Sequence, residues 1–324
     1  MAIYLVTGGA GFIGSHVAEF LVGKGHHVRV IDNLCTGYES NLVAFREQVD
    51  FHRMDICQTE NLAALMADVD CVFHLAALAS VPLSVEHPKK VNEACVDGTL
   101  SVLQAARHAG VRRVVYSASS ACYGDQPFCA NRETDITEPL SPYAVAKLTG
   151  ELYCQSFFRT YGLETVALRY FNVFGPRQDP NSHYAAVIPI FLSKILQGES
   201  PTIFGDGLQS RDFTFVENVV QANWLASQAE GVAGEVFNIA GGKSITLLTL
   251  VEQLSDLLGT DVDPIHAEPR AGEIRDSMAD ITRAHQRLGY EPSVSFQEGL
   301  RKSIDYYRAA FSSANPSINT SVSS

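Results

Sequence analysis

The sequence predicts an α/β protein in which a parallel sheet carries helices on both faces, followed by a smaller mixed α/β domain. In the first half, short runs of Val, Ile and aromatic residues alternate with amphipathic stretches whose apolar residues recur every three or four positions. This alternation is typical of right-handed βαβ units, which build a parallel sheet covered on both faces. Beyond Gly175 the elements become shorter and mixed, which indicates a second domain.

The elements of the first half follow from these patterns in order. Strands are predicted at Ile3–Val6, Val28–Ile31, Val49–His52, Asp70–Leu75, Val114–Tyr116 and Thr165–Tyr170. Helices are predicted at Ile13–Val22, Leu62–Met66 and Val96–Arg107, with a further one that begins at Tyr143. Two later runs, Phe213–Val216 and Val236–Ala240, are expected to return to the main sheet.

These elements define the expected domains. The first domain covers residues 1–175, with returns to it near 213–241. The second covers residues 176–311. The last residues, 312–324, show no hydrophobic periodicity, so we expect a mobile tail there.

Composition excludes several classes of protein. The 324 residues are 46% hydrophobic and 19% charged, which is the balance of an ordinary soluble enzyme. No apolar run is long enough to span a membrane, and the N-terminus lacks the pattern of a secretion signal. Because the seven cysteines form no C-x-x-C pair, we expect no metal site and a reducing, cytoplasmic compartment. The net charge of −12 disfavours nucleic acid, but it allows a phosphate-bearing ligand where positive charge is concentrated locally.

A glycine-rich turn, TGGAGFIG at residues 7–14, lies between the first predicted strand and the first predicted helix. Gly8, Gly11 and Gly14 suit the tight turn, the close approach to a pyrophosphate and the strand–helix packing of a Rossmann-type dinucleotide site. Asp32 ends the second strand about 20 residues later, where a carboxylate accepts hydrogen bonds from a ribose. A basic residue there would favour a 2′-phosphate, so NAD is predicted rather than NADP. The alternative, a flexible turn, explains neither the flanking elements nor the acid.

The other predicted cofactor contacts lie on the same turn or at strand ends. They are Phe12, Ile13, Asn33, Asp55, Ile56, Leu75, Ala76, Ala77 and Tyr170, together with Tyr143 and Lys147.

The segment SPYAVAK, residues 141–147, predicts the start of a helix with Ser141 as its N-cap. Tyr143 and Lys147 are four residues apart and share one face. A neighbouring ammonium and a cationic nicotinamide both favour the phenolate, so this tyrosine can serve as a base. Ser119 ends the fifth strand and can bond the same substrate oxygen. The alternative is a surface pair, which the upstream nucleotide fingerprint disfavours.

Taken together, TGGAGFIG, SASSACYG (117–124), SPYAVAK and RYFNVFGPRQDPN (169–181) resemble the extended short-chain dehydrogenase/reductase family up to about Tyr307. Within it, the chain resembles UDP-hexose 4-epimerases, particularly UDP-N-acetylglucosamine 4-epimerases of surface-polysaccharide pathways. The resemblance implies that Tyr143 is the acid–base, that Lys147 orients the nicotinamide ribose and that Ser119 polarises the sugar oxygen. It also implies a homodimer joined through helices near 96–107 and 143–158.

The resemblance further implies reversible C4 epimerisation of a UDP-hexose through a 4-keto intermediate. Ser120 and Ala121 follow Ser119, where related dehydratases and decarboxylases carry an acid, so those reactions are disfavoured. A UDP-glucuronate epimerase or decarboxylase, or another net nucleotide-sugar oxidoreductase, stays open as the alternative. A non-enzymatic NAD-sensing relative would have a broken Ser–Tyr–Lys set, and here the set is intact. Cys95 departs from the family, which usually has asparagine at this position.

The implied substrate contacts are Ser119, Ser120, Tyr143, Asn172, Ala186, Val187, Phe204, Arg211, Arg270 and Ser277. Arg211 and Arg270 match the family's diphosphate-binding arginines. Ser277 lies seven residues after Arg270, where relatives restricted to UDP-glucose and UDP-galactose carry an aromatic residue. A small side chain there leaves room for a 2-acetamido group, so UDP-N-acetylglucosamine and UDP-N-acetylgalactosamine are the expected pair, with UDP-glucose and UDP-galactose also admitted.

Overall fold

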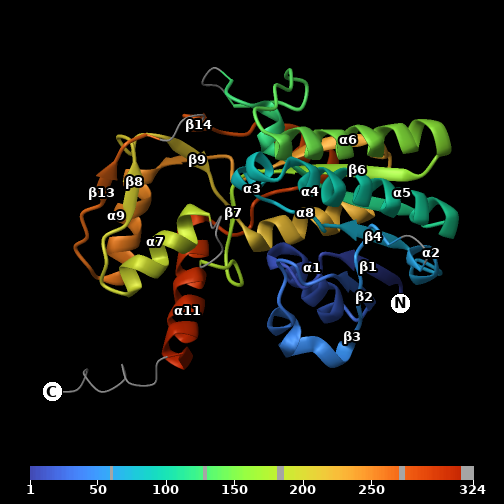
Figure 1. Cartoon of the computed structure of the whole chain (residues 1–324), viewed down its shortest axis with the longest axis horizontal. Helices are drawn as coiled ribbons and strands as arrows, with labels where there is room; N and C mark the ends of the chain where they lie inside the picture. Colours follow the sequence, from blue (N-terminus) through green and yellow to red (C-terminus); the bar gives the residue numbers. More distant parts are fainter. Residues whose placement is uncertain (59–60, 127–129, 181–185, 270–273, 315–324) are drawn as a thin grey trace.

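The computed structural model describes residues 1–58, 61–126, 130–180, 186–269 and 274–314. Its main feature is a seven-stranded sheet in the order β11-β6-β5-β4-β1-β2-β3, in which every pairing is parallel (Figure 1). The strands are β1 (Ile3–Thr7), β2 (His27–Asp32), β3 (Val49–Arg53), β4 (Cys71–His74), β5 (Arg113–Ser119), β6 (Glu164–Tyr170) and β11 (Glu235–Ile239). The predicted fold class is therefore confirmed.

Helices cover both faces of this sheet, because alternate strand residues point to opposite sides. On one face, Tyr4 and Val6 of β1 pack with residues of α1 and α8. On the other face, Leu5 packs with residues of α5 and α6. The first layer contains α1 (Phe12–Gly23), η1 (Glu39–Gln48), α8 (Val216–Gln228) and α10 (Thr282–Leu288). The second contains α2 (Leu62–Leu65), α3 (Val81–Glu86), α4 (Pro88–Asn92), η2 (Glu93–Asp97), α5 (Gly98–Ala109) and α6 (Pro142–Tyr161).

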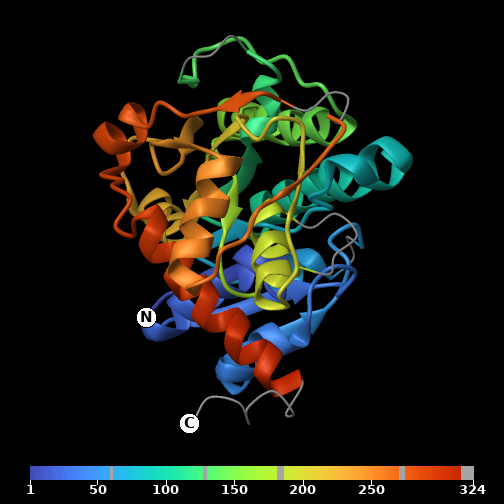
Figure 2. The same ribbon diagram turned by 90° about the vertical axis from the view of Figure 1, so that its left-hand side faces the viewer.

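The second domain has its own apolar core beside the carboxyl edge of the sheet. Figure 2 looks onto it, with α11 running beside α9 and α7. Its helices are α7 (Val187–Leu196), α9 (Leu247–Leu258) and α11 (Phe296–Ala314), and its core includes Phe191, Leu250 and Leu300. Its strands are β8 (Thr202–Phe204), β9 (Ser210–Asp212), β12 (Ser244–Thr246), β13 (Ile265–Ala267) and β14 (Asp276–Ser277). They form the sheets β12-β9-β14 and β13-β8.

The structure corrects three expectations. Val236–Ala240 does return to the main sheet as β11, but Phe213–Val216 does not. Because β11 occupies the position beside β6, β10 (Thr214–Phe215) pairs instead with β7 (Val173–Phe174), just beyond the end of β6. The predicted helix at 96–107 is divided, since η2 is a π-helix that precedes α5. Residues 312–314 do not belong to the expected tail, because α11 continues through Ala314; residues 315–324 lie outside the described residues.

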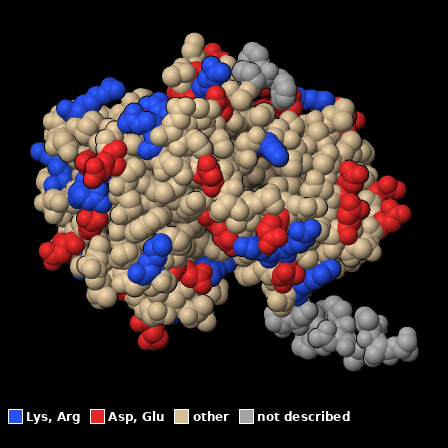
Figure 3. Space-filling view, turned by 180° about the vertical axis from the view of Figure 1, so that it is seen from behind, with Lys and Arg blue, Asp and Glu red and all other residues tan. Residues whose placement is uncertain are grey.

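Basic and acidic side chains are scattered together over the face seen in Figure 3. Among the described residues, no helix has the length and hydropathy of a membrane span.

Candidate active site

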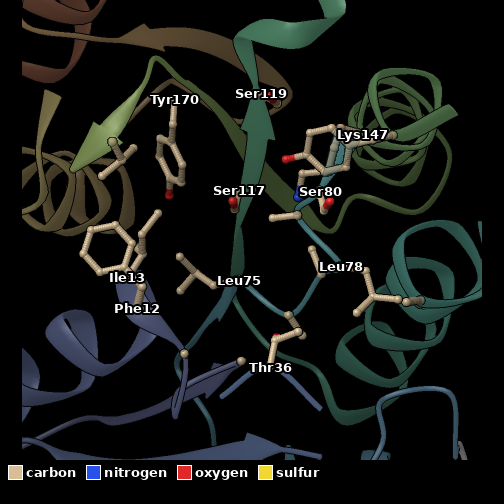
Figure 4. Close-up of a pocket in the computed structure, with 18 of the residues that line it drawn as sticks. Phe12, Ile13, Thr36, Leu75, Leu78, Ser80, Ser117, Ser119, Lys147 and Tyr170 are labelled. Atoms are coloured by element: carbon tan, nitrogen blue, oxygen red, sulfur yellow. The ribbon is translucent and has the colours of Figure 1, made fainter. Parts of the chain in front are cut away.

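A cavity of about 1210 Å³ lies at the carboxyl ends of the sheet strands, against the second domain. Ligands of open α/β sheets bind at this edge. Predicted cofactor contacts line it: Gly8, Gly11, Phe12, Ile13, Gly14, Asp32, Asn33, Asp55, Ile56, Leu75, Ala76, Ala77 and Tyr170. Predicted catalytic and substrate residues line the rest: Ser119, Ser120, Tyr143, Lys147, Asn172, Ala186, Arg211 and Ser277. In Figure 4, Tyr170 and Lys147 approach the cavity from opposite sides of β5.

The glycine-rich turn forms a cradle at the start of α1. Gly8 has φ +69°, and a Cβ there would lie 2.7 Å from the backbone nitrogen of Ala76. A Cβ on Gly14 would lie 2.1 Å from the carbonyl oxygen of Gly8, so both glycines are required by close packing. Gly11 is the N-cap of α1 and supplies no side-chain partner to the first N–H groups of the helix. Those N–H groups are suited to a pyrophosphate, and the residues present therefore fit a dinucleotide.

Asp32 connects the second strand to this cradle. Its carboxylate accepts hydrogen bonds from the backbone N–H groups of Ala10 (3.0 Å) and Leu34 (2.8 Å). Burial raises the pKa of Asp32, and these backbone hydrogen bonds oppose the rise. Beside it, the Asn33 amide donates to Asp55 (2.8 Å), which joins the ends of β2 and β3. This edge of the cavity offers the acceptors that a ribose requires.

The predicted catalytic residues lie on two elements that meet at the cavity. The Ser141 hydroxyl accepts a hydrogen bond from the N–H of Ala144 (3.2 Å), so the predicted N-cap of α6 is confirmed. Tyr143 and Lys147 follow on the first two turns of this helix, and both line the cavity. Ser119 lies at the end of β5 and forms a hydrogen bond with Tyr143.

Burial opposes the charges that catalysis requires. It raises the pKa of Tyr143, and the hydrogen bond with Ser119 lowers it again. Burial lowers the pKa of Lys147, whose ammonium lies 4.8 Å from the centroid of the Tyr116 ring. A cationic ring bound in the cavity would favour the phenolate, since opposite charges stabilise one another in a desolvated site. The residues can therefore work as an acid–base set once such a ligand is in place.

Cys95 lies in the π-helix beside this set. Its side chain is 1% exposed, and its thiol accepts a hydrogen bond from the N–H of Leu78. It packs with Ala146 in a small apolar cluster, against which Tyr143 also packs. The residue is a buried part of the wall behind the predicted base, and π-helical turns are frequent at functional sites.

Two of the predicted substrate contacts are brought together by strand pairing. Ser277 of β14 is the register partner of Arg211 of β9. The Arg211 guanidinium donates to the carbonyl oxygens of Ser210 (2.8 Å) and Arg275 (3.1 Å), and these contacts help fix its direction. The other predicted diphosphate-binding arginine, Arg270, lies outside the described residues.

Other predicted substrate contacts differ in their placement. The Asn172 amide donates to the carbonyl oxygen of Asp212 (3.2 Å). This hydrogen bond connects the cavity residue Asn172 to β9, the strand that carries Arg211. Val187 and Phe204 do not line the cavity. Val187 begins α7 and packs against the core of the second domain, while Phe204 ends β8. Their predicted ligand contacts stay predictions.

Several lining residues were not predicted from the sequence. They are mostly loop residues: Thr36, Tyr38, Leu78, Ser80, Val81, Lys90, Glu93, Tyr123, Asn131, Gln178 and Asp179. The loops that follow the strands of the main sheet carried a usable signal in the sequence, since loops at the carboxyl edge of such a sheet are expected to border the ligand.

Comparison with known proteins agrees with this geometry. The model of the NAD dependent epimerase/dehydratase family matches residues 4–240. A UDP-N-acetylglucosamine 4-epimerase from Methanobrevibacter ruminantium, solved with UDP-N-acetylmuramic acid, is 43% identical, with a TM-score of 0.91 over 95% of this chain and 99% of that one. A UDP-glucose 4-epimerase from Thermotoga maritima, solved with UDP-glucose, is 40% identical with the same TM-score and coverage. A UDP-glucuronic acid 4-epimerase from Bacillus cereus, solved with UDP-glucuronic acid and NAD, is 32% identical, with a TM-score of 0.89 over 95% and 99% of the chains.

The glycine cradle, the ribose-side acid and the Ser–Tyr–Lys set therefore occur together in a chain whose family is established by sequence and structure. The chain belongs to the NAD dependent epimerase/dehydratase family, the extended short-chain dehydrogenases/reductases, and is an NAD-dependent isomerase of that family.

Proposed function

We propose that the chain catalyses reversible C4 epimerisation of UDP-hexoses, with UDP-N-acetylglucosamine and UDP-N-acetylgalactosamine as its preferred pair and UDP-glucose and UDP-galactose as further substrates. The observation that carries the reaction is the convergence of Ser119, Tyr143 and Lys147 on the cavity that the glycine cradle borders. The names of the relatives at 43% and 40% identity support a UDP-sugar 4-epimerase.

In this mechanism the chain moves one proton and positions two ligands. NAD, when bound, supplies the acceptor for the C4 hydride of the sugar and later its donor. Tyr143 removes the C4 hydroxyl proton, and Ser119 bonds the same oxygen. Lys147 holds the ribose and favours the phenolate. The keto sugar then turns to present its other face, and Tyr143 returns the proton.

Few groups can fix the sugar ring, because both of its faces must be accepted in turn. The affinity must come from the UDP group, and forked guanidinium donors suit a diphosphate. Arg211, held by two carbonyl oxygens, is the described residue suited to this role, and Arg270 is its proposed partner. The turn after Ser119 carries Ser120 and Ala121, and so supplies no second acid for elimination.

The preference for the acetamido sugars rests on Ser277. This half-buried serine lies beside Arg211 in the strand register and lines the cavity. Its small side chain leaves space next to the proposed diphosphate anchor, where an aromatic ring would fill it. A wider pocket can still admit the plain hexoses, because a missing group changes affinity only modestly.

UDP-glucuronate is the second candidate substrate, since the Bacillus cereus relative is named for it. A uronate carboxylate can be held by a cation or by neutral hydrogen-bond donors near the sugar. The Lys and Arg residues among the described lining residues are Lys90, Lys147 and Arg211. Lys147 and Arg211 already have proposed roles, so Lys90 of α4 is the cation among the described lining residues that we assign to this candidate.

A substrate panel tests the proposal. The purified protein is incubated, without added NAD, with UDP-N-acetylglucosamine, UDP-glucose and UDP-glucuronate, and the products are separated by chromatography. We expect epimers of the first two, with the higher kcat/KM for the acetamido sugar. A higher kcat/KM for UDP-glucuronate would favour the second candidate, and no epimer from any of the three would refute the proposed reaction.

We also propose a homodimer that buries one face of α6. Val145 and Leu152 are 49% and 55% exposed and lie seven residues apart, so they share this face. Sedimentation should give a dimer for the wild type and a monomer for Leu152→Glu. Val43→Glu, at a 73% exposed position on η1, should stay dimeric. An unchanged dimer for Leu152→Glu would exclude this face.

The cytoplasmic location belongs to the same proposal. The cysteines that the structure describes are all free thiols, and free thiols favour a reducing compartment. Fractionation of the host cell tests it.

A further inference from the structure

A hydrogen bond joins two loops that border the cavity. The Tyr38 hydroxyl donates to a carboxylate oxygen of Asp179 at 2.7 Å, although the two residues are 141 positions apart. Tyr38 follows β2 and lies on the side of Asp32, whereas Asp179 follows β7 at the entrance to the second domain. Both residues line the cavity, so the contact spans its border from one domain to the other.

The backbone near Tyr38 is fixed on the glycine cradle. The N–H of Tyr38 donates to the carbonyl oxygen of Ala10 at 3.0 Å, and the Asn41 amide donates to the same oxygen at 2.9 Å. Gly37 permits this approach, because a Cβ there would lie 2.9 Å from the Asp32 carboxylate. The tyrosine thus extends from a loop that contacts both the pyrophosphate turn and the ribose-side acid.

The segment that carries Asp179 is anchored by contacts with α1 of the first domain and α11 of the second. Burial lowers the pKa of His16 on α1 to about 4, so its neutral ring donates to the carbonyl oxygen of Pro176 at 2.9 Å. Arg177 forms an ion pair with Glu19 of α1. The hydroxyl of Tyr307 on α11 donates to the carbonyl oxygen of the next residue, Gln178. Asp179 is therefore presented by a well-anchored segment.

We propose that the Tyr38–Asp179 hydrogen bond is a clasp that slows the release of the dinucleotide. Each of its ends is held by further contacts of its own, so the two loops can separate at this border only when the bond breaks. The proposal rests on the proposed function for its purpose but not for its geometry. Epimerisation needs the hydride removed from C4 to return to the same sugar, and release of the cofactor between the two steps would prevent this.

Release of the cofactor between the two steps would have a defined stoichiometry. If the cofactor is released after the first step, one UDP-hexose and one NAD⁺ are converted to one UDP-4-keto-hexose, one NADH and one proton. The C4–H electron pair then stays with the released cofactor, and the hydroxyl proton passes through Tyr143 to solvent. A loosened clasp would therefore convert part of the isomerase turnover into net oxidation of the sugar.

The test measures NAD release from the holoenzyme without any sugar present. Tyr38→Phe removes the hydroxyl and keeps the ring, and we expect about tenfold faster release, the effect of one hydrogen bond to a charged acceptor. Asp179→Ala should accelerate release by the same factor, and the double variant should be no faster than either single one. Tyr161→Phe is the matched control, since Tyr161 is 49% exposed and Tyr38 is 50% exposed. Unchanged release in Tyr38→Phe, or additive effects in the double variant, would overturn the clasp.

A second measurement separates the clasp from the proposed function. With UDP-N-acetylglucosamine, Tyr38→Phe should accumulate NADH and a keto sugar in equal amounts when free NAD is supplied. Faster release without any sugar turnover would support the clasp and refute the proposed function. Normal epimerisation with unchanged release would do the reverse.

Discussion

The predicted cofactor contacts border the cavity from the glycine-rich turn and the strand ends of the main sheet, whereas the predicted substrate contacts Arg211 and Ser277 lie on short strands of the second domain. We call these two regions the cofactor side and the substrate side. On the first side, Gly8 and Gly14 leave no space for a Cβ, and Asp32 is held by two backbone N–H groups. On the second side, Arg211 and Ser277 project from strands of three and two residues. We infer that the cofactor side tolerates almost no change, while the substrate side can change specificity through single side chains.

The junction of the two sides should show the largest effect. Tyr143→Phe removes the proposed proton acceptor without changing the glycine cradle, so we expect turnover of UDP-N-acetylglucosamine to fall about 10³-fold or more. NAD content, measured after denaturation of the purified protein, should stay at the wild-type level. Near-normal turnover of this variant would exclude Tyr143 as the base.

One added methyl group tests the close packing of the cofactor side. In Gly14→Ala the new Cβ would lie 2.1 Å from the carbonyl oxygen of Gly8, so the cradle must deform. We expect NAD affinity, measured by calorimetry on the cofactor-free protein, to fall about 100-fold, which corresponds to about 3 kcal/mol. Gly23→Ala is the control on the same helix, because a Cβ there meets nothing within 4 Å. Equal affinities for the two variants would contradict the close-packing argument.

The substrate side should instead respond selectively. Ser277→Tyr fills the space beside Arg211, so we expect kcat/KM for UDP-N-acetylglucosamine to fall at least about tenfold relative to UDP-glucose. The activity toward UDP-glucose is the internal control for folding. A parallel loss with both sugars, or no loss with either, would show that Ser277 does not determine the preference.

The smallest expected effect is a displacement of the pH profile. In the proposed mechanism activity rises with pH as Tyr143 loses its proton, and the hydrogen bond with Ser119 lowers the pKa of that tyrosine. Ser119→Ala removes this stabilisation of the phenolate, so the rising limb of kcat/KM should move to higher pH. A limb that stays in place, or moves to lower pH, would assign Ser119 only to substrate contact.

The cofactor side was largely predictable from the sequence, for the same reason that it is intolerant. A turn that needs glycine at fixed positions leaves a local signature, and doubly buried strands such as β4 leave apolar runs. The position of β10 was not predictable from the sequence. This two-residue strand pairs with β7, which lies just after β6, and no local pattern indicates that partner.

Contacts between segments that are distant in the sequence could not be predicted from it either. Nothing local in the sequence connects Tyr38 with Asp179, since their meeting depends on the placement of the segment after β7. The burial of Lys147 was missed as well; the helical spacing predicted the shared face with Tyr143, but not the apolar surroundings that lower the lysine pKa. Ser277 was identified by family resemblance, but its position beside Arg211 follows only from the strand register in the structure.

Epimerisation in D₂O without added NAD tests the central claim most directly. The purified protein is given UDP-N-acetylglucosamine, and the C4 position of the product is analysed by mass spectrometry and NMR. Because the hydride is held within the closed site and returned to the same carbon, we predict UDP-N-acetylgalactosamine with no deuterium at C4. Deuterium at C4, or a dependence of the product on added NAD, would contradict the account.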